Sequence, residues 1–226
     1  MRMILKLSRV LKLLTRHGSV RVRFSQYGED TIIRKYFKKS DGFYIDVGAH
    51  HPFKQSNTAY LWLQGWEGVN VDANSLSVEV FKKVRPRDIN VWSAIVSEQF
   101  AENNSVVDFY KSKSIDLCAS VSAELAADRG ATSVEAVPCT SLDKIIETYA
   151  PSDGRKIDFL NIDLEGLDEV AIEGISKWAS SPTMIAIETY VDTIPDVLGT
   201  RTFKLLTEAG YEYRYQIGLT SIYILA

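Results

Sequence analysis

Two short apolar runs, each followed by an acidic residue, constrain the fold of this chain most. Residues 43–45 lead into Asp46 and, two positions later, Gly48. Residues 69–71 lead directly into Asp72. An acid and a glycine after one buried strand, with an acid after the next strand, are typical of a nucleoside-binding βαβ unit. In such a unit the first strand-to-helix turn cradles the ligand, and the second acid holds its ribose hydroxyls.

The turn after the first strand lacks the glycines that a dinucleotide needs. The second and third glycine positions are occupied by His50 and Phe53, with Pro52 between them. Those glycines let the backbone approach a pyrophosphate, so side chains at these positions disfavour NAD and FAD. S-adenosylmethionine (SAM) carries an adenosine but no phosphate, and we expect it to be the cofactor. An ordinary α/β protein with a tight turn here remains the alternative.

Size and cysteine content place the chain among intracellular single-domain proteins. The 226 residues are 46% hydrophobic, which suits one α/β domain with a substantial core. Cys118 and Cys139 lie too far apart for a metal motif and form no disulfide framework, as expected in a reducing cytoplasm. No apolar run approaches the length of a membrane span.

Positive charge is concentrated at the N-terminus. Residues 1–23 carry seven Lys or Arg and no acid, which leaves the remainder at about −10. Apolar and basic residues separate onto two faces of a predicted basic amphipathic helix, with Ile4, Leu7, Leu11 and Leu14 opposite Lys6, Arg9 and Arg16. Residues 1–20 could bind an anionic membrane surface, or the helix could pack on its own domain. The acidic remainder argues against a nucleic-acid partner.

Helical and strand patterns alternate through residues 24–226, which we expect to form a single domain. This alternation predicts an α/β, Rossmann-like, doubly wound and mostly parallel sheet with an antiparallel C-terminal strand pair. Helices are expected at 25–38, 56–64, 75–83, 141–149, 166–178 and 200–209. Strands are expected at 42–47, 67–72, 88–96, 106–110, 133–138, 157–162, 183–188, 211–216 and 219–225. The segments 111–132 and 189–200 are expected to recognise the acceptor substrate.

Further acids follow two later strands. Asp163 ends the strand 157–162, Glu165 precedes the next helix, and Glu188 ends the strand 183–188. The carboxyl ends of parallel strands share one edge of a sheet, where ligands bind. We therefore expect these three acids to share that edge with the residues of the first two turns, namely Asp46, His50, His51 and Asp72.

The chain resembles the FkbM family of SAM-dependent methyltransferases, which have the Rossmann-like class I fold. The resemblance covers about residues 24–225. It rests on the residues at 25–30, 44–52, 56–58, 65–74, 85–90, 141–143 and 157–166. This chain departs from many members of the family by having His50 and Pro52 in place of Asn and Gly, and Asp72 in place of Glu.

The resemblance implies O-methylation of a hydroxyl on a sugar, a glycolipid or cell-surface polysaccharide, or a natural product. It implies that Asp46, Gly48 and Ala49 face the methionine part of SAM and that Asp72 holds the ribose. It further implies that Ala73 and Asn74 line the approach to the adenine, and that Ser93 and Ala94 flank the ring.

A hydroxyl acceptor needs a base, because its proton must leave as the new bond forms. Asp163 is the first candidate, His50 or His51 the second and Glu188 the third. A Mg²⁺ ion held by Asp163, Glu165 and Glu188 is a less favoured alternative. Two other functions stay open: a nicotinamide or flavin oxidoreductase on the same fold, and a non-catalytic membrane-surface scaffold. Only the basic N-terminus supports the scaffold.

Overall fold

The computed structural model describes residues 22–111, 133–191 and 193–226. Most of the basic N-terminal helix predicted for residues 1–23, and nearly all of the segment 111–132, lie outside the described residues. In the described part of the chain, no helix combines the length and apolar character needed to cross a bilayer.

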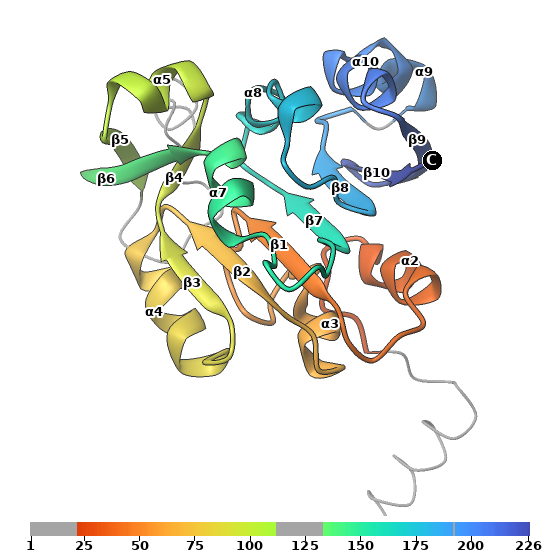
Figure 1. Ribbon diagram of the computed structural model, residues 1–226, viewed down its shortest axis with the longest axis horizontal. Coiled ribbons are helices and arrows are strands. Elements are labelled where there is room, and N and C mark those ends of the chain that lie inside the picture. Colours follow the sequence, from red (N-terminus) through yellow and green to blue (C-terminus); the bar gives the residue numbers. More distant parts are fainter. Residues whose placement is uncertain (1–21, 112–132, 192) are drawn as a thin grey trace, which may run out of the picture.

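A seven-stranded sheet forms the centre of the molecule (Figure 1). Its order is β3-β2-β1-β7-β8-β10-β9, and all pairs from β3 to β8 are parallel. β10 is antiparallel to both of its neighbours, β8 and β9. The strands are β1 (Phe43–Val47), β2 (Glu67–Asp72), β3 (Ile89–Trp92), β7 (Phe159–Ile162), β8 (Met184–Glu188), β9 (Tyr211–Ile217) and β10 (Thr220–Leu225). The predicted fold class is confirmed.

A second, three-stranded sheet contains β4 (Ala94–Val96), β6 (Ser133–Ser141) and β5 (Val106–Lys111), in the order β4-β6-β5. The single strand predicted for 88–96 is therefore two strands in two sheets. The break is at Ser93, whose amide donates to the Asp72 carbonyl (3.1 Å) and whose hydroxyl donates to the Pro138 carbonyl (3.1 Å). These two bonds turn the chain away from β2 and toward β6.

Helices cover both faces of the central sheet. The helices are α2 (Glu29–Tyr36), α3 (Ala59–Leu63), α4 (Ser75–Val84), α5 (Glu98–Asn103), α7 (Leu142–Tyr149), α8 (Asp168–Ala171), the 3₁₀ turn η1 (Ile175–Lys177), α9 (Ile194–Gly199) and α10 (Arg201–Glu208). Residues of α7, α8 and α10 share one apolar cluster with the sheet, and residues of α2 and α3 share another with its opposite face. Alternate residues of β1 feed the two clusters, with Ile45 in the first and Tyr44 in the second.

Three helices differ from the sequence prediction. The helix expected at 166–178 is broken into α8 and η1, because the Asp168 side chain accepts from the amides of Leu164 and Gly166 and holds that stretch as a turn. Neither α5 nor α9 was expected. Both have a hydroxyl N-cap, from Ser97 and Thr193 respectively, which compensates for their short length.

Candidate active site

The turn after β1 is wedged between the ends of β2 and β7. The amides of Gly48 and Ala49 both donate to the Val71 carbonyl, at 2.9 and 3.2 Å. Gly48 has a φ of 74°, and a β-carbon at this position would overlap the backbone carbonyl of Asp163. Glycine is therefore required at residue 48 for two reasons, its backbone conformation and the close approach of β7.

Asp72 joins the turns that follow β1 and β2. Its two carboxylate oxygens accept from the amides of His50 and Asn74, each at 2.7 Å. Burial raises the pKa of Asp72 to about 6, although both hydrogen bonds oppose this shift. The side chain is thus mainly ionised at neutral pH, and each oxygen keeps a lone pair for a further donor. This arrangement fits the two hydroxyls of a ribose.

The residues expected around the adenine have diverse roles in the structure. Asn74 is buried and caps α4 by accepting from the Leu76 amide (3.0 Å), while Ser93 and Ala94 are buried where the chain crosses to the second sheet. Trp92, which pairs with Asp72 in the β2–β3 register, is 38% exposed, and its indole donates to the Ala73 carbonyl (2.9 Å).

Asp46 lies beneath the turn after β1. Its carboxylate is buried and accepts from the Thr58 hydroxyl (2.6 Å) and the Asn161 amide (2.9 Å). Burial raises its pKa. The resemblance implied that this side chain faces the methionine part of the cofactor, but the structure assigns both of its oxygens to other residues of the chain.

Arg85, which follows α4, is fully buried and links to the same network. Its guanidinium donates to the hydroxyls of Thr58 (2.9 Å) and Ser56 (3.1 Å), and also to the Pro52 carbonyl. It lies over the Phe81 ring, 5.1 Å from the centroid. In the sequence, Arg85 was noted only within the segment 85–90 of the family resemblance. In the structure, its side chain fixes residues 52–58 against one face of the sheet.

The two histidines differ in their environment. The Nδ1 atom of His51 accepts from the amides of Phe53 (3.1 Å) and Lys54 (3.0 Å). Burial, with the nearby charges of Lys54 and Arg85, lowers the pKa of His51. Its imidazole is therefore neutral, with the proton on Nε2, and it organises the turn. His50 has a φ of 54° and contributes its backbone amide to Asp72.

Asp163 and Glu188, the acid pair, lie close together where the neighbouring strands β7 and β8 end. Burial raises the pKa of Asp163 well above its usual value, and the charges of Glu188 and Asp168 raise it further. A carboxyl group with a raised pKa thus lies beside Gly48, whose backbone contacts that of Asp163.

Two residues beside this pair adopt the left-handed backbone conformation, which is uncommon without glycine. They are Glu165, with a φ of 52°, and Tyr190, with a φ of 51°. The Tyr190 hydroxyl lies 3.4 Å from a Glu165 carboxylate oxygen. Burial and the charge of Glu188 raise the pKa of Tyr190, so its phenol remains a donor at any ordinary pH. Unusual backbone conformations often occur at functional sites.

Comparison with known proteins identifies the family. The sequence profile described as the methyltransferase FkbM domain matches residues 46–213, which is most of the chain.

The chain belongs to the FkbM methyltransferase family.

Two solved structures of methyltransferases are similar to this family member in shape. A TehB-like SAM-dependent methyltransferase from Corynebacterium glutamicum aligns with a TM-score of 0.44 and 11% identity over 98% of this chain and 97% of that chain. The precorrin-6y C5,15-methyltransferase from Geobacter metallireducens aligns with a TM-score of 0.37 and 12% identity over 91% and 89%. No curated protein matches the sequence.

The FkbM-family site therefore has two parts on one edge of the sheet. The part that fits a nucleoside consists of Asp72, Gly48 and Ala49. The acidic part consists of Asp163, Glu165 and Glu188, which were expected at this edge from the parallel order of the strands. Asp168 and Trp92 lie beside these groups, and so does Tyr190, which belongs to the segment 189–200 that was expected to recognise the acceptor. Among the residues that the structure describes, no group of three or more His, Cys, Asp or Glu side chains is arranged to hold a metal ion.

Proposed function

We propose that this FkbM-family methyltransferase methylates a hydroxyl group of a sugar, a glycolipid or cell-surface polysaccharide, or a natural product. One observation carries the proposal: Asp163, a carboxyl group with a raised pKa and a second carboxyl group on Glu188 close by, lies beside the turn at Gly48. A hydroxyl is a poor acid, so its methylation needs a group that can accept a proton at the site of transfer.

The acid pair has the properties of such a base. The ionised form of Asp163 can accept the proton of an acceptor hydroxyl, and the raised pKa of Asp163 makes that form a stronger base than an ordinary exposed carboxylate. The Tyr190 phenol and the Glu165 carboxylate, which are close to the pair, add one donor and one acceptor. A donor and an acceptor side by side suit the hydroxyl groups of a polyol.

The remaining residues would hold SAM, whose sulfonium supplies an already electrophilic methyl group. The Asp72 carboxylate would accept from the ribose hydroxyls, and the Trp92 indole ring would lie beside the adenine. Gly48 and Ala49 would form the floor under the methionine part. The protein's contribution is then mainly to position the acceptor oxygen in line with the methyl group, at about 3 Å.

His50 is the second candidate base. His51 is a weaker one, because its Nδ1 atom already accepts two amides and its Nε2 atom carries a proton. Replacing each histidine by Gln separates the two roles. Loss of transfer in His50→Gln with normal transfer in Asp163→Asn would move the base from the acid pair to His50.

Isotope transfer tests the proposed reaction. The purified protein, incubated with methyl-labelled SAM and cell-envelope fractions, is expected to label a carbohydrate-containing product, with the label on an ether oxygen by mass spectrometry. Label on nitrogen or carbon would refute O-methylation while leaving the methyltransferase assignment intact. A thermal-shift comparison of SAM, S-adenosylhomocysteine, NAD and FAD is the control, in which only the first two should stabilise the protein.

A further inference from the structure

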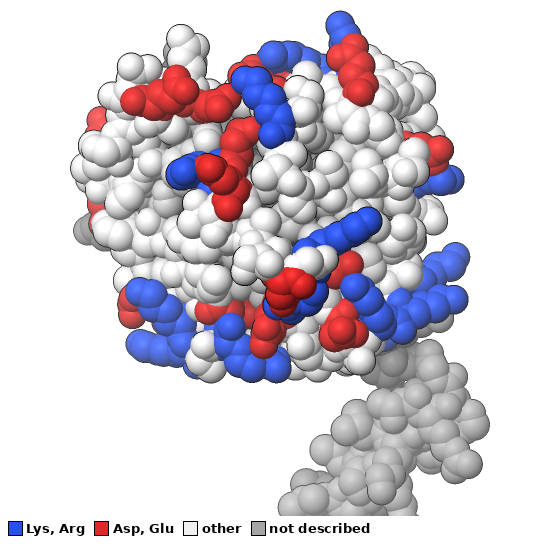
Figure 2. Space-filling view, in the orientation of Figure 1, with Lys and Arg blue, Asp and Glu red and all other residues white. Residues whose placement is uncertain are grey.

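The charges of this chain are separated more strongly than its net charge of −3 suggests. Residues 1–40 contain 11 of the 26 Lys and Arg residues but only 2 of the 29 Asp and Glu residues. Those two acids, Glu29 and Asp30, are buried, so they do not offset positive charge at the surface. In the face drawn in Figure 2, Lys and Arg side chains line the lower border, beside α2 and α4 of Figure 1, with Asp and Glu side chains among them.

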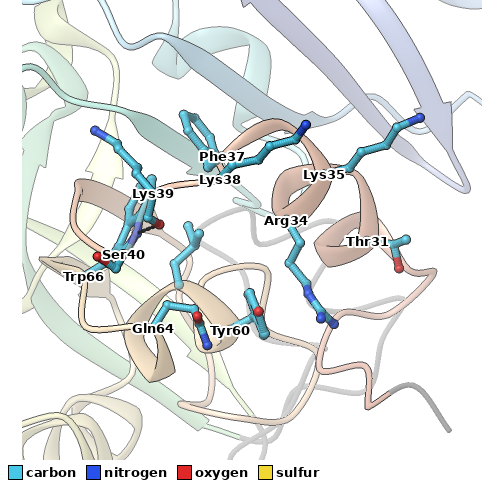
Figure 3. Close-up of a pocket in the computed structure, with 11 residues that line it drawn as sticks. Thr31, Arg34, Lys35, Phe37, Lys38, Lys39, Ser40, Tyr60, Gln64 and Trp66 are labelled. Carbon is cyan, nitrogen blue, oxygen red and sulfur yellow. Dashed lines mark hydrogen bonds between the residues drawn. The ribbon is translucent and has the colours of Figure 1, made fainter. Parts of the chain in front are cut away.

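The basic residues of α2 and the following loop surround a hollow of about 650 Å³ between α2 and α3 (Figure 3). Its rim carries four basic side chains, namely Arg34, Lys35, Lys38 and Lys39. Arg34 lies over the Tyr60 ring at 3.8 Å, and Lys39 pairs with Asp158 at 2.7 Å. Lys35 and Lys38 extend outward in Figure 3 and are exposed. We call these four residues the basic rim.

The two helices that border the hollow also carry exposed apolar side chains. Tyr36 of α2 is 42% exposed and Leu63 of α3 is 49% exposed. Basic residues interspersed with exposed aromatic and aliphatic groups are the combination that an anionic lipid surface binds, since the charges meet the headgroups and the apolar groups enter the interface. A nucleic acid would use the positive charge but would gain little from Leu63.

The position of the rim supports the same partner. Lys39 lies just before β1, at the amino edge of the sheet, whereas Asp72, Asp163 and Glu188 lie at the carboxyl edge. The described chain begins at Val22, and the Phe24 amide donates to the Asp30 carboxylate in the first turn of α2 (3.1 Å). The described chain therefore starts beside α2, the helix that carries Arg34 and Lys35.

We propose that the basic rim, with Tyr36 and Leu63, docks the protein onto an anionic phospholipid membrane. The carboxyl edge of the sheet stays free in this arrangement, so docking and methyl transfer can proceed together. The proposal does not depend on which acceptor is methylated.

Vesicle co-sedimentation of the full chain tests the proposal. Binding is expected to vesicles of phosphatidylcholine with added phosphatidylserine, to be weak with phosphatidylcholine alone, and to fall as salt rises. Each basic residue near such a surface contributes a factor of about five, so the double variant Lys35→Glu/Lys38→Glu should bind at least about 25-fold more weakly. Both positions are exposed, so the variant is expected to fold normally.

A matched control changes the same charge elsewhere. Lys144→Glu/Lys204→Glu, on the exposed surfaces of α7 and α10, should bind vesicles as the unmodified chain does. A chain without residues 1–21 should still bind anionic vesicles and stay sensitive to Lys35→Glu/Lys38→Glu. Equal losses in the two double variants, no preference for anionic vesicles, or retention on RNA without retention on vesicles would overturn the proposal.

Discussion

Gly48 and Asp163 meet backbone to backbone at the carboxyl edge of the sheet, where the turn after β1 touches the end of β7. This contact fixes the separation between the part of the site that fits a nucleoside and the acid pair. The geometry of methyl transfer depends on that separation, since the acceptor oxygen must align with the donor methyl group.

Gly48→Ala is expected to lower the free energy of unfolding by about 3 kcal/mol or more, from left-handed backbone strain and from overlap with the Asp163 carbonyl. Gly154→Ala is the matched control, because Gly154 also has a positive φ, of 85°, but no atom within 4 Å of an added β-carbon. The control should lose only about 1–2 kcal/mol. Urea unfolding measures both values, and equal losses would show that the contact with Asp163 is unimportant.

Asp163→Asn should leave SAM affinity unchanged and reduce the rate constant of transfer by about 10²–10⁴, the usual contribution of a general base. The amide keeps the shape of the carboxyl group and can still hydrogen-bond to Glu188. Calorimetric titration with SAM and single-turnover transfer of label separate binding from chemistry. A variant with normal transfer would exclude Asp163 as the base.

Binding of SAM should weaken below pH 6. The pKa of Asp72 is raised to about 6, so the carboxylate that accepts from the ribose becomes protonated as the pH falls through this value. If the ionised form alone binds well, affinity drops about tenfold for each further unit of pH. Calorimetric titration with SAM between about pH 5 and pH 8 measures this change in affinity.

Two variants of Asp72 provide the controls. Asp72→Ala should bind SAM at least about 100-fold more weakly, because two charge-assisted hydrogen bonds are lost. Asp72→Asn should bind weakly without the change near pH 6. The same pH dependence in Asp72→Asn as in the unmodified chain would assign the titration to another group.

Asp168 should make stability depend on pH. Burial raises its pKa from 3.8 to about 6, so protonation favours the folded state. The contribution of Asp168 to the free energy of unfolding is fully present below pH 3.8 and is lost as the pH rises through about 6. The total loss is about 3 kcal/mol. Asp168→Asn cannot ionise. The unfolding free energy of the unmodified chain, minus that of this variant, should therefore decrease between about pH 4 and pH 6.5. Above about pH 6.5 it should stay constant.

Topology made much of this site predictable from sequence. β2 was predicted with its observed bounds, 67–72, and the sharing of one edge by Asp72, Asp163 and Glu188 followed from the parallel order of the strands. These features depend on local apolar runs and on a general rule for parallel sheets. No distant contact had to be known.

The unpredicted features depend on contacts between residues far apart in the chain. The break at Ser93 needs the Pro138 carbonyl, 45 residues away, and the burial of Asp46 needs Asn161, 115 residues away. By contrast, α9 had a local signal that was not used. Thr193 precedes a proline in the first turn, which is a common start for a helix.

The two hydrogen bonds that Asp72 accepts from His50 and Asn74 have a thermodynamic consequence for the ligand. The turns after β1 and β2 are already joined to one carboxylate in the protein alone, so their ordering entropy is lost during folding instead of during binding. A ribose that reaches Asp72 then meets acceptors in their final orientation. Association of the nucleoside should consequently carry a small entropic penalty from the backbone, and its rate should be limited by encounter more than by rearrangement of these turns.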